Sequence, residues 1–179
     1  MFGRRLRLWV GSIIGLVLLA VIGGLIFIYS GIYNVAATYP DSAPAEWLLG
    51  AVMDHSVARH ARGIKVPALD DPAKIRAGAG LYATMCAGCH GAPGVEVGKV
   101  ARGLNPPPPE LTEAAGDWKP NEFFWITKNG IRMSGMPAMD MTYSDDEIWA
   151  ITAFAQKLPA MKPAEYKALT SPTAAPNTK

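Results

Sequence analysis

The most constraining feature of this sequence is a stretch near its amino terminus that contains no charged residue. Residues 8–29 are 22 residues without Lys, Arg, Asp or Glu, and after Arg7 no charge appears until Asp41. As a helix that rises about 1.5 Å per residue, this stretch would be about 33 Å long, which is enough to cross the hydrocarbon core of a membrane. The sequence therefore predicts one transmembrane helix over residues 8–29.

The charges on either side predict the orientation of this helix. Three arginines lie within residues 1–7, whereas the next basic residue is Arg59. Because basic residues remain on the cytoplasmic side, residues 1–7 are predicted to be cytoplasmic and the chain after the helix to lie outside. A cleaved signal peptide is the alternative, since residues 35–37 have the small side chains that a signal peptidase accepts. Signal peptides have a shorter apolar core, of about 7–15 residues, so an uncleaved anchor is favoured.

The remainder of the chain carries no net charge. From residue 64 to residue 179, 12 Lys and Arg balance 12 Asp and Glu, so the formal charge of +2 comes from the segments before it. A neutral surface gives no reason to expect nucleic acid as a partner and predicts no strong electrostatic steering.

Two helices are predicted directly after the anchor. Residues 30–69 combine a turn-rich tether with an amphipathic helix expected over residues 46–64. The next helix is expected over residues 68–91, because Asp70 or Asp71 can cap its amino terminus. Apolar residues recur at helical spacing on one of its faces.

Two further helices complete the predicted domain, and no segment predicts a strand. A short helix is expected to begin with Asn121 as its cap and to stop at Gly130. The last helix begins at Ser144, where SDDE forms a capping box, and ends before Pro159. The sequence predicts an all-α domain over residues 70–162, followed by a tail over residues 163–179 that is disordered at its end.

The pentapeptide CAGCH, residues 86–90, contains the candidate cofactor-binding residues. In an exported domain, Cys86 and Cys89 could form a disulfide or act as a redox-active dithiol. Neither alternative explains His90 directly after the second cysteine, whereas C-x-x-C-H is the pattern of c-type haem attachment. Each thiol would form a thioether with the haem, and the histidine would reach its iron from one side. These are the only two cysteines in the chain, so one covalently bound haem c per chain is predicted.

A second cluster, MSGMPAMDM, contains four of the eight methionines of the chain within nine residues. An iron held by a histidine needs a sixth ligand, and a thioether in that position raises the reduction potential of a haem. Met136 is the preferred candidate, because Pro137 restricts its backbone and Gly135 allows the main chain to approach closely. Met139 is the fallback.

The other candidates for this role are weaker. Met133 and Met141 are expected to pack near the haem edge or in the core, as methionine commonly does. His55 and His60 are five residues apart and do not share one helix face, so a second histidine ligand is disfavoured.

With these motifs, residues 70–158 resemble the class I cytochromes c, which are small all-α electron-transfer domains with one haem. The resemblance rests on CAGCH, on NGIRMSGMPAM and on the final helix sequence DEIWAITAFAQKL. It implies a class I cytochrome c fold, here preceded by one N-terminal transmembrane helix. It also implies that the first and last helices of the domain cross closely, with Gly78 and Tyr82 on the first and Ile151 and Phe154 as candidates on the last.

The same resemblance assigns the ligands of the iron. His90 and Met136 would be axial, and the free ring N–H of His90 would bond to a backbone carbonyl near residues 104–107. Candidate neighbours of the haem propionates are Arg102, Trp125 and Arg132.

The resemblance implies single-electron transfer and no catalysis of its own. The predicted location is the bacterial inner membrane, with the haem domain in the periplasm or on the outer face. Respiratory proteins, such as a quinol-oxidising complex or a terminal oxidase, are the expected partners. One alternative is a fixed cytochrome c subunit of a larger membrane oxidoreductase. Another is a haem enzyme or gas sensor with an open axial site.

Overall fold

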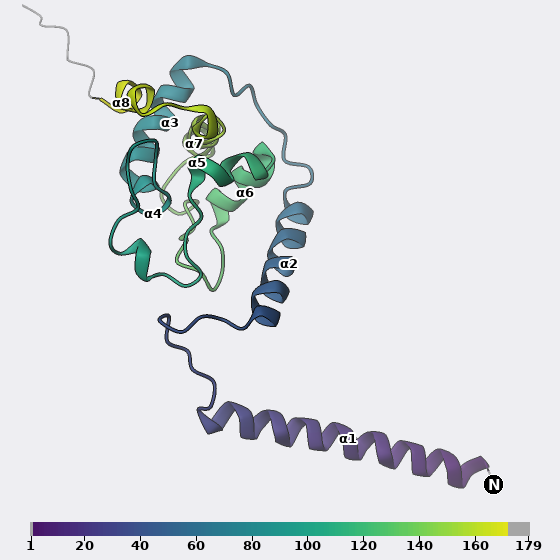
Figure 1. Ribbon diagram of the computed structural model, residues 1–179. Coiled ribbons are helices and arrows are strands. Elements are labelled where there is room, and N and C mark those ends of the chain that lie inside the picture. The colour runs from purple at the N-terminus through teal and green to yellow at the C-terminus, as the bar shows by residue number, and fades with distance from the viewer. Residues whose placement is uncertain (1, 172–179) are drawn as a thin grey trace, which may run out of the picture. The chain divides into compact units, whose positions relative to one another are not determined.

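The structure is a computed structural model that describes residues 2–171, and its regular elements are all helical (Figure 1). The described part of the chain contains no β-strand, only an isolated bridge between Ala92 and Val95. The chain divides into one unit that ends at Tyr39 and a second that begins at Pro40. The predicted all-α class is confirmed.

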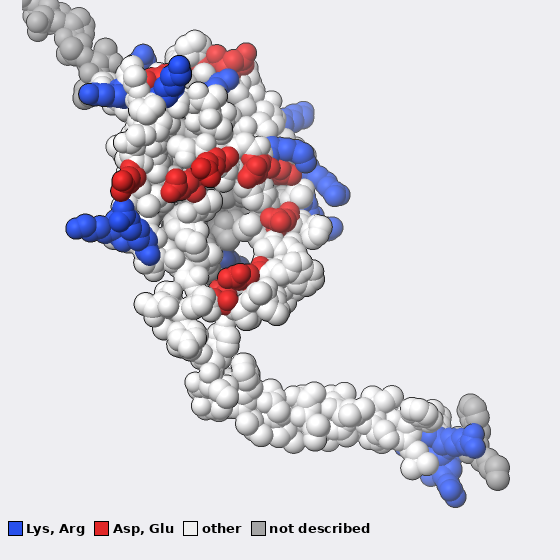
Figure 2. Space-filling view, in the orientation of Figure 1, with Lys and Arg blue, Asp and Glu red and all other residues white. Residues whose placement is uncertain are grey.

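The first unit contains helix α1, Phe2–Ser30. Residues Gly3–Ser30 are long and apolar enough to cross a membrane, a criterion that a signal sequence also meets. Lys and Arg gather only at the amino-terminal end of this helix in the space-filling view (Figure 2). The apolar side chains of α1 are exposed along its length, as is typical of a helix whose surroundings are lipid.

Helix α2 spans Ala43–His60, so it begins and ends earlier than the predicted range of 46–64. Pro44 lies within its first turn, where a missing N–H costs no hydrogen bond. The chain leaves the helix through Ala61 and then Gly63, whose φ of 128° suits glycine best. Val57 and Ala61 are almost completely buried, so the carboxyl-terminal half of α2 is part of the second unit.

Helices α3, Pro72–Met85, and α7, Asp145–Ala155, form the centre of the second unit. Asp71 caps α3 by accepting from the amide of Ala73 at 2.9 Å. The capping box at Ser144 begins α7 as predicted. A Cβ at Gly78 would overlap the carbonyl of Ala150, so only glycine permits this crossing.

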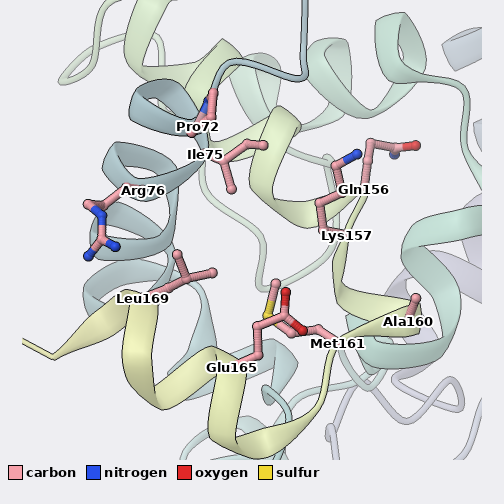
Figure 3. A pocket seen from close by; sticks show the side chains of 9 residues that line it. All are labelled: Pro72, Ile75, Arg76, Gln156, Lys157, Ala160, Met161, Glu165 and Leu169. Atoms are coloured by element: carbon pink, nitrogen blue, oxygen red, sulfur yellow. The ribbon is translucent and has the colours of Figure 1, made fainter.

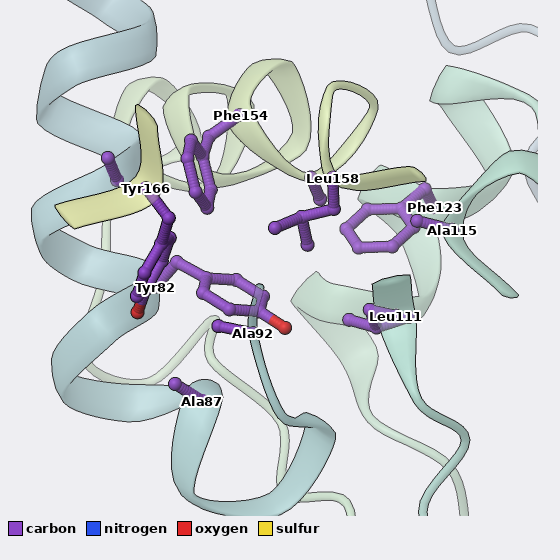
Figure 4. Packing of buried hydrophobic residues seen from close by; sticks show 11 residues of the cluster. Tyr82, Ala87, Ala92, Leu111, Ala115, Phe123, Phe154, Leu158 and Tyr166 are labelled. Carbon is purple, nitrogen blue, oxygen red and sulfur yellow. The ribbon is translucent and has the colours of Figure 1, made fainter. Parts of the chain in front are cut away.

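The main core lies beside this crossing (Figure 4). The rings of Tyr82 and Phe154 have centroids 5.3 Å apart, and that of Tyr166 lies 6.2 Å from Phe154. The predicted contact through Phe154 is confirmed. Ile151 is buried, but Ala150 is the residue that faces Gly78.

Two expectations about the remaining helices were wrong. Helix α6, Pro120–Asn129, is capped by Lys119 and not by Asn121, because Pro120 occupies its first position. Helix α8, Pro163–Thr170, was not predicted, yet its Tyr166 is buried in the main core. The compact unit therefore continues beyond the predicted boundary at residue 162. The end of the predicted tail, residues 172–179, lies outside the described residues.

Short elements connect these helices. They are α4, Ala87–His90; η1, Ala101–Gly103; α5, Leu111–Ala114; η2, Ala115–Asp117; and η3, Leu158–Ala160. Helix α7 ends at Ala155, and Pro159 lies in η3, where the chain turns towards α8.

Candidate haem-binding site

The CAGCH segment forms a tight turn at the end of α3. Cys86 ends α3 and begins α4, and its amide donates to the carbonyl of Tyr82 at 2.9 Å. The amide of Cys89 in turn donates to the carbonyl of Cys86 at 3.0 Å. The two thiols are therefore presented one helical turn apart. Both are half-buried and not joined in a disulfide.

The electrostatics of Cys86 disfavour a redox-active dithiol. Burial, together with the neighbouring Cys89, raises the pKa of the Cys86 thiol to about 12. Reactive cysteines instead have lowered pKa values, because the thiolate is the nucleophile. The raised pKa of Cys86 thus disfavours its thiolate, and with it a role as the nucleophile of a redox-active pair.

His90 is oriented by a backbone carbonyl from a distant loop. Its Nδ1 lies 2.9 Å from the carbonyl oxygen of Pro109. The acceptor lies just beyond the predicted range of 104–107, so that range was wrong by two residues. Burial lowers the pKa of His90, although the bond to Pro109 acts in the opposite direction. A neutral ring that donates through Nδ1 keeps the lone pair of Nε2 for a metal.

The turn that carries His90 is itself held from two sides. The hydroxyl of Tyr82, which is fully buried, donates to the carbonyl of Gly91 at 2.7 Å. Gly91 has a φ of 67°, which lets the chain reverse directly after the histidine. The loop then returns, and the amide of Gly98 donates to the carbonyl of Gly88 at 2.8 Å. The position of His90 is thus determined by both core and loop contacts.

The loop around Met136 is closed on itself by hydrogen bonds. The amide of Ile131 donates to the carbonyl of Met136 at 3.3 Å. The hydroxyl of Ser134 donates to the carbonyl of Ile131 at 2.7 Å and accepts from the amide of Met136 at 3.2 Å. Gly130, with a φ of 65°, packs so tightly against Pro137 and Ala138 that a Cβ would lie 2.7 Å from both backbones. This loop holds Met136 half-buried.

The other methionines of the cluster are placed differently. Met139 packs against the buried cluster of Phe124, Ile148 and Trp149, so its side chain is used in the core. Met133 and Met141 are 79% and 89% exposed, so neither packs in the core, and packing near the haem edge remains a prediction for both. Met133 has a φ of 62°, which lies in the left-handed region that residues other than glycine rarely adopt. Within the cluster, Met136 remains the best candidate ligand.

Lys128, near the end of α6, holds the carboxyl-terminal end of the methionine loop. The ammonium of Lys128 lies 3.2 Å from a carboxylate oxygen of Asp140 and 2.6 Å from one of Asp145. The amides of Met139 and Asp140 both donate to the carbonyl of Lys128 at 3.0 Å. The loop is therefore tied to α6 and to the start of α7, which the sequence analysis did not anticipate.

The histidine and methionine segments are linked through the irregular loop between them. A Cβ at Gly135 would lie 2.7 Å from the side chain of Leu104, so the loop that follows η1 packs on the methionine loop. The same irregular loop provides the Pro109 carbonyl for His90. It contains a cis Asn105–Pro106 peptide bond. Residues 104–109 thus contact both candidate axial segments.

The three predicted propionate neighbours are not gathered at one place by their contacts. Arg102 is exposed and forms an ion pair with Glu96 at 3.0 Å. Trp125 is half-buried and stacks on His60, with ring centroids 5.5 Å apart and planes 25° from parallel. Arg132 is exposed. These three assignments remain predictions.

A surface groove elsewhere on the second unit contains none of these residues. It lies between α3, α7 and α8, and its lining includes Arg76, Lys157 and Glu165 (Figure 3). Between residues 2 and 171 no group of three or more His, Cys, Asp or Glu side chains could hold a bare metal ion.

The residues at CAGCH fit a c-type haem. Cys86 and Cys89 are free thiols on one turn, and His90 is oriented through its Nδ1. A histidine and a half-buried thioether are the axial donors of an electron-transfer haem. The donor set therefore matches the cofactor that the sequence predicts.

A comparison with protein families supports this interpretation. Residues 73–154 match the family model described as cytochrome C oxidase, cbb3-type, subunit III. No curated protein matches the chain. The matched segment begins in α3, ends in α7 and contains both CAGCH and the Met136 loop. Its helices, its motif and its family match together support a cytochrome c-type domain in this chain.

Proposed function

We propose that this protein is a membrane-anchored c-type cytochrome that transfers single electrons through one covalently attached haem. Cys86 and Cys89 form the thioethers, and His90 and Met136 are the axial ligands. The observation that carries the proposal is the CAGCH turn, in which the Nδ1 of His90 lies 2.9 Å from the Pro109 carbonyl. This bond selects the tautomer whose Nε2 can bind iron.

When bound, the haem supplies reversible one-electron exchange between ferrous and ferric iron. The protein keeps both axial donors in place, so that little rearrangement accompanies this exchange. Pro109 and Tyr82 hold the histidine turn, while Ser134 and Gly130 hold the methionine loop. Burial of His90 keeps its imidazole neutral by lowering the pKa. With His90 and Met136 both bound, water would be kept from the iron.

The location follows from α1. Its length and its basic amino-terminal end support an uncleaved anchor in the bacterial inner membrane, with the cytochrome domain in the periplasm or on the outer face. A tether that confines the domain near the membrane raises its effective concentration for membrane-bound partners. Respiratory donors and acceptors, such as a quinol-oxidising complex or a terminal oxidase, fit this position.

A second candidate is a fixed subunit of a membrane oxidoreductase. The matched family model is described as a subunit of a cbb3-type oxidase, which favours a stable assembly for domains of this kind. Purification in a mild detergent distinguishes the two roles. Further subunits in constant stoichiometry are expected for a fixed subunit, whereas a chain that purifies alone indicates an independent carrier.

The visible spectrum of the ferrous protein with and without carbon monoxide tests the proposed ligation. The unmodified protein is expected to show an unchanged spectrum, because Met136 occupies the sixth position. Met136→Leu is expected to bind carbon monoxide promptly. Met141→Leu is the matched control, since Met141 is 89% exposed, and it should behave like the parent. Prompt binding by the parent would contradict the methionine ligand and favour a gas sensor or haem enzyme.

A further inference from the structure

The amino-terminal half of α2 exposes apolar side chains that nothing in its own unit covers. Trp47, Leu48 and Val52 are 74%, 54% and 58% exposed. Leu48 and Val52 are four residues apart and therefore lie on the same side of the helix. Leu49, which is 48% exposed, adjoins them. Together these four residues form a patch, called here the α2 patch.

The other half of α2 is fixed to the cytochrome domain. Asn121 of α6 donates through its side-chain amide to the carbonyl of Ala61 at 2.9 Å. His60 stacks on Trp125, also of α6, and Val57 is 1% exposed. Because α6 leads directly into the Met136 loop, α2 and the candidate haem site belong to one unit. Whatever binds the α2 patch therefore orients the whole domain.

The chain that leads to the α2 patch carries almost no charge. No charged residue occurs between Arg7 and Asp41. In the tether, Ile32 and Val35 are 76% and 88% exposed, which is unfavourable in water. Figure 2 likewise shows an uncharged surface along α1 beyond its basic end. Exposed apolar side chains thus occur in the proposed span, in the tether and in α2.

The tether also limits how far α2 can lie from the membrane. Twelve residues separate Ser30, the end of α1, from Ala43, the start of α2. Even a fully extended tether spans at most about 45 Å. Tryptophan favours the membrane interface, where its ring lies among apolar groups and its N–H can bond to polar groups. Trp47 is the most exposed member of the α2 patch.

We propose that residues 43–52 of α2 lie in the lipid–water interface and thereby hold the cytochrome domain in one orientation on the membrane. The inference rests on the proposed anchor and adds a second membrane contact to it. Binding depends on apolar contact and not on anionic lipid, because Glu46 and Asp54 are the charged residues beside the α2 patch. Leu48, Leu49 and Val52 enter the interface, as the apolar face of an interfacial helix does.

Site-specific fluorescence quenching in nanodiscs of phosphatidylcholine tests this inference on the full-length holoprotein. Single cysteines are introduced as Leu48→Cys and Val52→Cys and labelled with an environment-sensitive fluorophore, since the haem thioethers occupy the two natural thiols. Leu19→Cys, within α1, reports on the anchor. Glu113→Cys, at an exposed residue of α5, is the control for a site in water. An unchanged haem spectrum verifies that each variant is folded.

Each label is quenched separately by brominated lipid chains and by iodide in water. We expect brominated lipid to quench the labels at 48, 52 and 19, and iodide to quench only the label at 113. If 48 and 52 respond to iodide while 19 responds to lipid, the anchor stands and the α2 inference is overturned. Protection of 48 and 52 from both quenchers would indicate a second copy or another protein on the α2 patch, and would also overturn it. If the label at 19 is not quenched by lipid, the anchor itself fails.

Discussion

Tyr82 illustrates how a single residue connects the core of this protein to its candidate site. Its ring packs between the crossing helices, within 5.3 Å of Phe154, while its hydroxyl donates to the carbonyl of Gly91 beside His90. Burial is the main cause of its raised pKa, so the hydroxyl remains protonated and a donor. The family resemblance predicted Tyr82 as a packing residue, but not as the support of the histidine turn. A buried tyrosine needs a hydrogen-bond partner for its hydroxyl. A tyrosine predicted in the core could therefore have indicated that its hydroxyl bonds to a nearby backbone carbonyl.

Replacing Tyr82 tests this support. Tyr82→Phe leaves the buried Gly91 carbonyl without its donor, which costs about 1–3 kcal/mol of the free energy of unfolding. Denaturant unfolding of the holoprotein, followed by visible absorption, measures the change. Tyr166→Phe is the matched control, because its ring packs in the same core without contacting Gly91. An equal loss in both variants would contradict a specific role for the Tyr82 hydroxyl.

At the scale of elements, the crossing of α3 and α7 depends on the small size of Gly78. A Cβ at this position would overlap the carbonyl of Ala150 and lie 3.0 Å from the Cβ of Phe154. By contrast, a Cβ at Gly80 would meet nothing within 4 Å. The two glycines are in the same helix, but only one of them is required by packing. Nothing in the structure explains Gly80.

This contrast gives a paired prediction. Gly78→Ala forces the two helices apart and is expected to lower the free energy of unfolding by about 1–3 kcal/mol or more. Gly80→Ala is expected to raise it by about 0.5–1 kcal/mol, because alanine favours the helix. Thermal unfolding of the two holoproteins measures both effects. Changes of the same sign would show that the crossing can relax.

The ion pairs of Lys128 connect the methionine loop to helices α6 and α7. The side-chain hydrogen bond to Asp145, followed by that to Asp140, raises the pKa of Lys128. The pKa of Lys128 in the folded protein lies above its unfolded value of about 10.4. The ion pairs therefore make their full contribution to the free energy of unfolding at pH values below about 10.4. Their contribution is lost as the pH rises through the folded pKa. The ion pairs should therefore weaken, and the loop loosen, as the pH rises into the alkaline range.

Lys128→Gln is expected to reproduce this loosening at neutral pH. Partly exposed pairs contribute less than about 1 kcal/mol, so global stability should change little. Hydrogen exchange at the amides of Met139 and Asp140 should accelerate, since both donate to the carbonyl of Lys128. Lys167→Gln, in the exposed part of α8, provides the control. Unchanged exchange at these two amides would show that the backbone bonds alone hold the loop.

At the scale of the whole molecule, α2 joins the cytochrome domain to the segment that follows α1. Its attachment depends on few contacts, chiefly the amide of Asn121 on the Ala61 carbonyl and the stacking of His60 on Trp125. Ala61 is fully buried, so its carbonyl has no access to water as an alternative partner. The attachment of α2 is thus separable from the folding of the central helices.

Asn121→Ala is expected to weaken this attachment selectively. Loss of one hydrogen bond to a buried carbonyl costs about 1 kcal/mol or somewhat more. The amides of α2 should then exchange faster, while those of α3 and α7 remain protected. Asn129→Ala, whose side chain bonds only within α6 to the Trp125 carbonyl, is the matched control. Faster exchange throughout the domain would instead show that α2 is integral to the core.

Local patterns in the sequence determined much of this protein. The apolar helix α1, the caps at Asp71 and Ser144 and the all-α class follow from interactions within a few residues. CAGCH is equally local, because its three functional side chains lie on one turn. The glycine at the helix crossing was identified through a family resemblance and is confirmed by the close approach of Ala150.

Only the tertiary structure decided which distant groups meet. Pro109 as the partner of His90, Leu104 against Gly135 and Asn121 on Ala61 join residues far apart in sequence, and no local pattern encodes such pairs. The helix cap at Lys119 and helix α8 were missed for a related reason. Prolines at the first helical positions mark both starts, but α8 is stabilised mainly by burying Tyr166 against the core. Local chemistry sets the elements and the attachment motif, whereas long-range packing sets the geometry of the site.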